Sequence, residues 1–184
     1  QIWKVSSDGT DVICKLFHAD AGSPLFPNDP KAEATTLRPL AGTGLAPKLI
    51  GSVNTDAGPC LTYRYVPRGW DPTPVEVVAR GLRRLHAQRP PSGLRLIPQG
   101  DAELAQQTRE ILAQCRGEQA RKLLDLAPDP LNMGSVDPCL VHGDAVVGNV
   151  IVAHHGAVFI DWQCPGLGDP CEDLAMFLSP AMQT

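Results

Sequence analysis

The chain has 184 residues, a formal net charge of −4 and a 43% share of hydrophobic residues, which is enough for one domain or a two-lobed unit with a real core. No basic block stands out and no apolar run approaches the roughly 18 residues of a membrane span, so we expect neither nucleic acid nor a membrane as a partner. The six cysteines form no C-x-x-C pair, which argues against a zinc site or a disulfide framework and predicts reduced, largely buried thiols in a cytoplasmic protein.

Two short strands are predicted at the beginning of the sequence. Residues 2–5 and 11–17 are rich in β-forming side chains and flank a turn signal at residues 8–9. Lys15 is the only polar residue among residues 12–17, so its strand neighbours are apolar on whichever face it lies. A lysine is almost never fully buried without a partner, so this one needs an explanation.

A helix is predicted to follow, with a capping residue at position 28 or 29 and proline at its first helical position. Glu33 shares one face of this helix with Leu37 and Leu40. Pairing Glu33 with Lys15 would explain why both charged residues point inward. The alternative is that Lys15 extends to solvent from an edge strand while Glu33 lies on the rim of the helix.

Further elements follow in alternation. A strand rich in β-formers is predicted over residues 60–66. Residues 73–76 fit a capping box with proline at the first helical position, and an apolar stripe continues beyond them. Another helix is predicted to begin at Asp101 and to be interrupted at Gly117. The apolar side of that helix consists of Leu104, Ile111, Leu112 and Cys115.

Residues 138–175 carry the most informative pattern in the chain. Three polar residues, Asp144, Asn149 and Asp161, lie at the edges of apolar runs. Taken singly, each of them is equally well explained as a turn residue or as the cap of a loop or strand. Their joint occurrence with the segment that follows favours a functional site.

The spacing of these polar residues predicts that they meet in space. Residues 150–152 and 158–160 are short β-branched-rich runs, and residues 155–156 supply a turn signal between them. A hairpin of that length returns the chain close to its starting point. Asn149 and Asp161 are therefore predicted to be neighbours.

This arrangement suits phosphoryl transfer. Such a reaction needs a carboxylate that orients the attacking hydroxyl, and oxygen ligands for the magnesium ions that neutralise the phosphates. Protein kinases supply them from the sequence H-R-D-x-x-x-x-N followed by an aspartate in D-F-G. Here residues 142–149 keep His, Asp and Asn at the same spacing, and residues 160–162 read Ile-Asp-Trp.

The stretch resembles the aminoglycoside phosphotransferase and choline kinase family, the small-molecule relatives of the protein kinases. That family has H-G-D-x-x-x-x-N, then I-D-W, then G-D-P-x-x-D-L-A, and residues 142–149, 160–162 and 168–175 match all three in order. One departure is Val147, because members often carry proline at this position. The departure concerns the rigidity of the loop rather than the chemistry.

The resemblance implies an α+β, protein-kinase-like fold of two lobes. Residues 1–66 would form a small antiparallel sheet lobe, and residues 67–184 a mainly helical catalytic lobe, with the boundary near residues 66–71. Relatives usually open with a strand and a phosphate-covering loop ahead of a segment like residues 2–5, and continue for several helices beyond one like residues 174–180. We therefore expect the chain to lack both ends of that fold.

The resemblance also implies a nucleotide site in the first lobe. Lys15 would be the nucleotide-binding lysine and Glu33 its partner. Backbone groups of Arg64, Tyr65 and Val66 would hydrogen-bond the adenine of ATP. The alternative is that the tyrosines of this strand are ordinary strand aromatics.

In the second lobe the resemblance implies the catalytic residues. Asp144 would orient the acceptor hydroxyl, and Asn149 and Asp161 would hold Mg2+. The expected activity is ATP-dependent transfer of phosphate to a small hydroxylated molecule, which is aminoglycoside-, choline- or sugar-like. A metallophosphoesterase needs a D-x-H and a G-N-H, and the sequence has neither. A nucleotide-binding pseudokinase without turnover is the remaining alternative.

Overall fold

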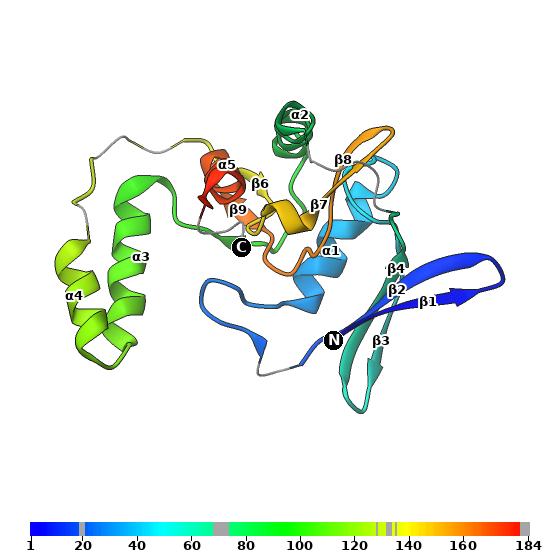
Figure 1. The fold of residues 1–184 in the computed structure, drawn as a ribbon, viewed down its shortest axis with the longest axis horizontal. Coiled ribbons are helices and arrows are strands. Elements are labelled where there is room, and N and C mark those ends of the chain that lie inside the picture. Colours follow the sequence, from blue (N-terminus) through cyan, green and yellow to red (C-terminus); the bar gives the residue numbers. More distant parts are fainter. Residues whose placement is uncertain (19–20, 68–73, 128, 132–133, 135, 181–184) are drawn as a thin grey trace.

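The computed structural model describes the whole chain except residues 19–20, 68–73, 128, 132–133, 135 and 181–184. Figure 1 shows a four-stranded sheet at one end of the molecule, a pair of helices at the other end, and further helices and short strands between them. The predicted α+β architecture is confirmed. The proposed lobe boundary near residues 66–71 runs into residues that are not described, so the division into lobes stays a prediction.

A four-stranded antiparallel sheet in the order β1-β2-β4-β3 forms the first part of the fold. Its strands are β1 (Ile2–Ser7), β2 (Thr10–Leu16), β3 (Leu49–Thr55) and β4 (Gly58–Arg64). The predicted turn between β1 and β2 is present, with Asp8 and Gly9 both at positive φ, as a two-residue hairpin turn requires. The sequence did not predict β3, because most of its residues are exposed and it lacks an apolar alternation.

Helix α1 (Pro30–Leu40) lies between β2 and β3 in the sequence. Asp29 is its cap, since the carboxylate accepts hydrogen bonds from the backbone N–H groups two and three residues later, at 2.8 and 3.1 Å. Glu33, Leu37 and Leu40 are all buried, which confirms the predicted inward face. The helix therefore places a carboxylate among core leucines.

Helix α2 (Val75–His86) packs against the hairpin of β7 (Val150–Ala153) and β8 (Gly156–Phe159). The approach is close at Gly81, where a Cβ atom would lie 2.8 Å from the Cβ of Ala157. A larger residue at Gly81 would push the helix away from the hairpin.

The predicted apolar stripe of α2 is largely confirmed. Val78, Leu82 and Leu85 are buried, whereas Val75 at the start of the helix is exposed. Thr73, the predicted capping residue, lies outside the described residues.

The turn of the β7–β8 hairpin differs by one residue from the prediction. Ala153 pairs with Gly156, so the two-residue turn consists of His154 and His155, and Gly156 is the first residue of β8. The pairing of Val150 with Phe159 sets this register. Buried side chains on both strands, rather than the glycine, decide where the turn falls.

A second small sheet supports the loop between β6 and β7. It contains β5 (Arg95–Leu96), β6 (Cys139–Val141) and β9 (Gly166–Gly168) in the order β5-β9-β6. These strands have two or three residues each and carry too little pattern to be predicted. Helix α5 (Pro170–Leu178) follows β9, and the chain enters it at Asp169.

Helices α3 (Gly100–Gln114) and α4 (Glu118–Leu126) pack against each other at the end of the molecule opposite the large sheet (Figure 1). Gly117, at φ +128°, separates them, as predicted. The apolar side of α3 does not enter the main core: no residue of α3 is buried, and Leu104 is 55% exposed.

A hydrophobic core joins the two parts of the fold and includes Phe17 and Leu61 from the first part and Leu140 and Trp162 from the second. The six cysteines are free, but Cys164 alone among them is buried. The expectation of largely buried thiols is therefore wrong, because Cys14, Cys60 and Cys139 are only half-buried and Cys115 and Cys171 are exposed. Within the described ranges, no helix has the length and apolar character needed to cross a membrane.

Candidate active site

The loop after β6 brings Asp144 and Asn149 into contact. A 3-10 turn, η2 (Val147–Asn149), precedes β7 and includes the position where relatives often have proline. The Nδ2 group of Asn149 donates hydrogen bonds to the backbone oxygen and to Oδ2 of Asp144, each at 2.9 Å. The Asp and Asn of the H-G-D-x-x-x-x-N motif, five residues apart in the sequence, are therefore in direct side-chain contact.

The hairpin returns the chain to Asn149, as predicted. The backbone N–H of Ile160 donates to the carbonyl oxygen of Asn149 at 2.9 Å, and Asp161 follows directly. Asp161 adopts a φ of +62°, in the left-handed region that few non-glycine residues occupy. This backbone conformation changes the direction of the chain at Asp161, directly after the hairpin.

Lys15 of β2 reaches two carboxylates at once. Its Nζ donates to Oε2 of Glu33 at 2.7 Å and also to Oδ1 of Asp161. Lys15 and Glu33 are almost fully buried, whereas the side chain of Asp161 is 26% exposed. The predicted pairing of Lys15 with Glu33 is confirmed, and the contact with Asp161 is an addition that the sequence did not predict.

The carboxylate of Glu33 is destabilised by its position. Burial raises its pKa to about 7. The ammonium group of Lys15 opposes that rise in pKa, and the nearby charge of Asp161 adds to it. One lysine is shared between two carboxylates, and its charge offsets only part of the effect of burial on the pKa of Glu33.

Asp144 has a similar environment. Burial and, to a smaller extent, the nearby charge of Asp161 raise its pKa to about 6. Hydrogen bonds from the side chains of Asn149 and Gln163 oppose the increase in pKa, as does the charge of Lys15. Asp144 is thus a carboxylate with raised proton affinity, which is the property required of a group that accepts a proton from an alcohol near neutral pH.

His142 of the H-G-D motif has a structural position. It is fully buried, its ring centroid lies 4.4 Å from that of Trp162, and its Nε2 lies 2.9 Å from the carbonyl oxygen of Ile160. Burial lowers the pKa of its imidazole. The ring therefore contacts the end of the hairpin through Ile160 and Trp162.

Asp173 of α5 holds the start of the loop that follows β6. Its two carboxylate oxygens accept hydrogen bonds from the backbone N–H groups of His142 and Gly143, at 2.9 and 3.0 Å, and Oδ2 lies 2.9 Å from Nε2 of His86. Gly143 has a φ of +74°, and a Cβ there would overlap the carbonyl oxygen of Cys164. Only glycine fits this position.

The two aspartates of the G-D-P-x-x-D segment therefore differ in role. Asp173 holds the start of the loop after β6, whereas Asp169 caps α5 by accepting from the backbone N–H of Cys171 at 2.8 Å. The proline after Asp169 starts the helix and ties that residue to capping.

Asp173→Asn is expected to lower the free energy of unfolding by about 1.5 to 3 kcal/mol, because the amide cannot replace all of the charge-assisted hydrogen bonds to buried N–H groups. Asp169→Asn is the matched control, since asparagine caps a helix about as well as aspartate. Chemical denaturation of both variants measures the difference. Equal stability losses in the two variants would contradict the assigned role of Asp173.

A pocket of about 230 Å3 lies between the large sheet and the hairpin. Asn149 and Asp161 line it from the hairpin side, and Arg64, Tyr65 and Val66 from the end of β4. The other lining residues are Ile2, Ile13, Pro47, Tyr63, Ile151 and Ile160. The pocket is therefore mostly apolar, with polar groups at one wall.

Few backbone N–H groups at the end of β4 are free to bind a ligand. The N–H groups of Arg64 and Tyr65 donate to the carbonyl oxygens of Lys48 and Asp11, at 2.9 and 3.1 Å. Within the described part of the chain the N–H of Val66 has no such partner. A ligand at this edge would meet that N–H group rather than the other two.

The structure thus brings together most of the residues proposed from the sequence. Asp161 and Asn149 line the pocket directly. Lys15 contacts Asp161 and pairs with Glu33, and Asp144 accepts a hydrogen bond from Asn149. Two groups of site residues were missed. Gln163 gave no signal beyond its closeness to the aspartate, and the apolar pocket walls are isoleucines and a proline that read as ordinary strand and loop residues.

Comparisons with known proteins place the chain in a family. The model of the phosphotransferase enzyme family matches residues 1–184. No curated protein matches the chain.

Solved structures share the fold. An aminoglycoside-3'-phosphotransferase of type VIII is 21% identical, with a TM-score of 0.66, and the match covers 96% of this chain and 72% of that one. An aminoglycoside phosphotransferase from Streptomyces rimosus is 22% identical, with a TM-score of 0.61 and 98% and 77% coverage. Choline kinase from Streptococcus pneumoniae is 20% identical, with a TM-score of 0.61 and 100% and 67% coverage. The match along the whole sequence, together with the loop and hairpin described above, shows that the chain belongs to the phosphotransferase enzyme family.

Proposed function

We propose that the protein transfers the γ-phosphate of ATP to a hydroxyl group of a small molecule. The observation that carries the proposal is the contact network at the pocket between sheet and hairpin: Asp161 and Asn149 line the pocket, Lys15 contacts Asp161, and Asp144 accepts a hydrogen bond from Asn149. These residues come from three separate segments of the chain. A carboxylate with raised proton affinity, oxygen ligands and a buried ammonium group are the parts that phosphoryl transfer uses.

The related structures support a nucleotide and a small acceptor. The Streptomyces rimosus enzyme has also been solved in complex with ADP and streptomycin, and a spectinomycin phosphotransferase in complex with ADP and spectinomycin. By analogy we propose ATP as the phosphate donor and an aminoglycoside-, choline- or sugar-like alcohol as the acceptor. A cytoplasmic location, where ATP is available and thiols stay reduced, is part of the proposal.

The proposed position of ATP follows from the pocket. The adenine ring would lie between the isoleucines, with the N–H of Val66 and backbone groups of the neighbouring Arg64 and Tyr65 at its edge. The phosphates would then extend toward Lys15 and Asp161, where the ammonium group supplies positive charge.

The residues present fit a magnesium ion. Among the described residues no cluster of three or more His, Cys, Asp or Glu side chains is arranged to hold a metal by itself. Magnesium, however, usually takes one or two protein ligands together with substrate phosphates and water. The carboxylate of Asp161 is one such ligand. Since Nδ2 of Asn149 is engaged with Asp144, its Oδ1 faces away and offers a second.

The proposed mechanism assigns the proton to Asp144. The acceptor oxygen attacks the γ-phosphorus while its proton passes to the Asp144 carboxylate, and the bond from the γ-phosphorus to the bridging oxygen of ADP breaks. The products are ADP and a phosphate monoester. Bound magnesium would neutralise charge on the phosphates. Asn149 holds the Asp144 carboxylate in position through its hydrogen bond.

A turnover assay tests the proposed function. ADP release is measured with ATP and magnesium against a panel of aminoglycosides, choline, sugars and amino alcohols. We expect acceptor-dependent ADP release with at least one class. ATP binding without release on any acceptor would instead support a pseudokinase, and no ATP binding would contradict both.

Removal of either proposed magnesium ligand should weaken magnesium-dependent binding of ATP more than metal-free binding. Losing a group that merely supports a metal ligand typically costs 10- to 100-fold in metal affinity, so Asp161→Asn and Asn149→Leu should each cost at least about that. Calorimetric titration of ATP with magnesium and with a chelator measures the two affinities. Equal losses under both conditions would point to a purely structural role.

A further inference from the structure

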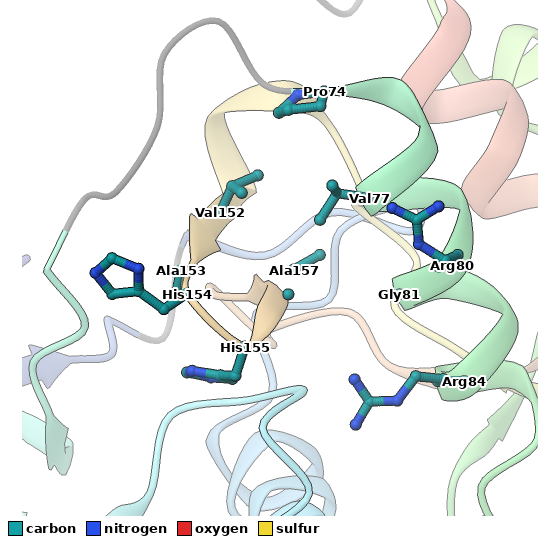
Figure 2. Close-up of a pocket in the computed structure, with 11 residues that line it drawn as sticks. Pro74, Val77, Arg80, Gly81, Arg84, Val152, Ala153, His154, His155 and Ala157 are labelled. Carbon is teal, nitrogen blue, oxygen red and sulfur yellow. The ribbon is translucent and has the colours of Figure 1, made fainter.

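A second cavity, of about 430 Å3, lies between α2 and the turn end of the β7–β8 hairpin (Figure 2). The proposed magnesium ligands are at the other end of that hairpin, so this cavity is separate from the active site. Its apolar lining includes Val77, Val152 and Ala157, and its charged lining residues are Arg80 and Arg84. Cavities of roughly 300 to 1,000 Å3 are large enough for small ligands.

The inner wall of this cavity is apolar and firmly packed. Val77 of α2 faces Val152 and Ala157 of the hairpin across it (Figure 2). The close approach of Gly81 to Ala157 fixes the distance between helix and hairpin. A ligand would therefore find a preformed apolar wall rather than one that must rearrange.

The outer wall is positively charged. Arg80 and Arg84 lie one helical turn apart on α2, and Figure 2 shows both guanidinium groups beside the cavity. None of the lining residues is acidic. In the part of the chain that the structure describes, neither arginine forms an ion pair with a carboxylate. Like charges at this spacing destabilise a helix slightly, so an anion between them would be favourable.

One of the two arginines is already held in place. The Nη2 group of Arg84 donates to the carbonyl oxygen of Thr43 at 2.7 Å. A guanidinium group has five N–H donors, so most of those of Arg84 remain available. Its orientation, however, is fixed before any ligand arrives.

The two histidines of the turn line the cavity but do not direct their rings toward the arginines. In Figure 2 the rings of His154 and His155 point away from α2. The ring of His155 packs near Gly44, where a Cβ would lie 2.9 Å from its Cδ2 atom. Recognition of an anion therefore depends on the two arginines.

We propose that this cavity binds a phosphate monoester carried on a small apolar body. A phosphate monoester has a charge of about −1.5 to −2 at neutral pH, which matches two guanidinium groups. Arginine also binds phosphate oxygens in bidentate geometry, which makes it the preferred cation for this group. The apolar wall formed by Val77, Val152 and Ala157 would accommodate the rest of the molecule. The inference does not depend on the reaction proposed above.

Calorimetric titration with phenyl phosphate tests this inference, with Arg80→Gln as the principal variant. Arg80 is exposed and its side chain makes no hydrogen bond or ion pair among the described residues, so the change should leave the fold intact. Because hydrogen bonds to charged groups contribute about 1.5 to 3 kcal/mol, we expect affinity to fall about tenfold or more. Arg83→Gln is the matched control, since it removes the same charge from α2 outside the cavity lining. It should change affinity less than about twofold.

Two further measurements separate this site from the nucleotide pocket and test the apolar wall. Adenosine in excess should leave phenyl phosphate binding unchanged, because no residue that lines the nucleotide pocket also lines this cavity. Inorganic phosphate should bind more weakly than phenyl phosphate. The proposal is overturned if the unaltered protein does not bind phenyl phosphate at millimolar concentration, if Arg80→Gln and Arg83→Gln bind equally well, or if the phenyl group adds no affinity.

Discussion

Replacing Asp144 with asparagine is expected to lower the rate of phosphoryl transfer by about 10²- to 10⁴-fold, the usual contribution of general acid–base catalysis. Asparagine keeps the size of the side chain but cannot accept a proton from the attacking hydroxyl. Nucleotide affinity should remain nearly unchanged, because Asp144 does not line the pocket between sheet and hairpin. The loss should therefore appear in kcat rather than in the dissociation constant of ATP.

Single-turnover rates and ATP titrations on the same preparation distinguish the two quantities. Asp137→Asn is a suitable control, since it makes the same chemical change at an exposed position ahead of β6. A variant of Asp144 with unaltered turnover would exclude the proposed role. Equal losses of rate in both variants would show that the effect is a general one on the fold.

The parts of this site that were predictable from the sequence are local ones. The spacing of Asp144 and Asn149 and the hairpin between Asn149 and Asp161 are set within one continuous segment. Over such a segment, strand propensity and turn chemistry determine which residues return to the same place. The register was predicted with an error of one residue at the turn, which did not affect the open end where the polar residues lie.

The pairing of Lys15 with Glu33 was predictable for a different reason. Each residue occupies an otherwise apolar face, and the cost of an isolated buried charge leaves few solutions other than mutual pairing. The contact of Lys15 with Asp161 could not be obtained in this way. Asp161 is partly exposed and needs no partner for burial, so its position depends on how sheet and hairpin pack.

Other features depend on tertiary packing alone. Asp173 holds the loop at His142 from the first turn of α5, and nothing in the sequence next to Asp173 indicates a partner 30 residues earlier in the chain. Likewise, the apolar side of α3 predicted an inward-facing helix, but α3 packs on α4 away from the main core. Periodicity shows that a helix has an apolar side and does not show what covers that side.

Lys15→Met is expected to lower both the free energy of unfolding, by roughly 3 to 5 kcal/mol, and the affinity for ATP. Removing one partner of a buried ion pair leaves the other charge uncompensated, which accounts for the size of the stability loss. Here the partner left without a lysine is Glu33, which is 1% exposed. The affinity should fall because the ammonium group beside Asp161 would no longer face the phosphates.

The chain offers a matched control for this change in Lys4 on the adjacent strand. Lys4 also pairs with an aspartate, Asp11, at 2.7 Å, but both side chains are more than a third exposed. An exposed pair contributes about 0 to 1 kcal/mol, so Lys4→Met should cost far less than Lys15→Met in chemical denaturation. If the two variants lose the same stability, burial does not determine the strength of the Lys15 pair.

Glu33→Gln separates the two effects of this pair. The amide removes the buried negative charge, so Lys15→Met made in the Glu33→Gln background should cost less stability than it costs alone, and a double-mutant cycle gives the coupling energy. ATP affinity should still fall in Glu33→Gln, since the lysine loses the group that positions it and retains only Asp161. A coupling energy near zero would mean that the 2.7 Å contact between Lys15 and Glu33 contributes no net stability and that Asp161 alone compensates the lysine.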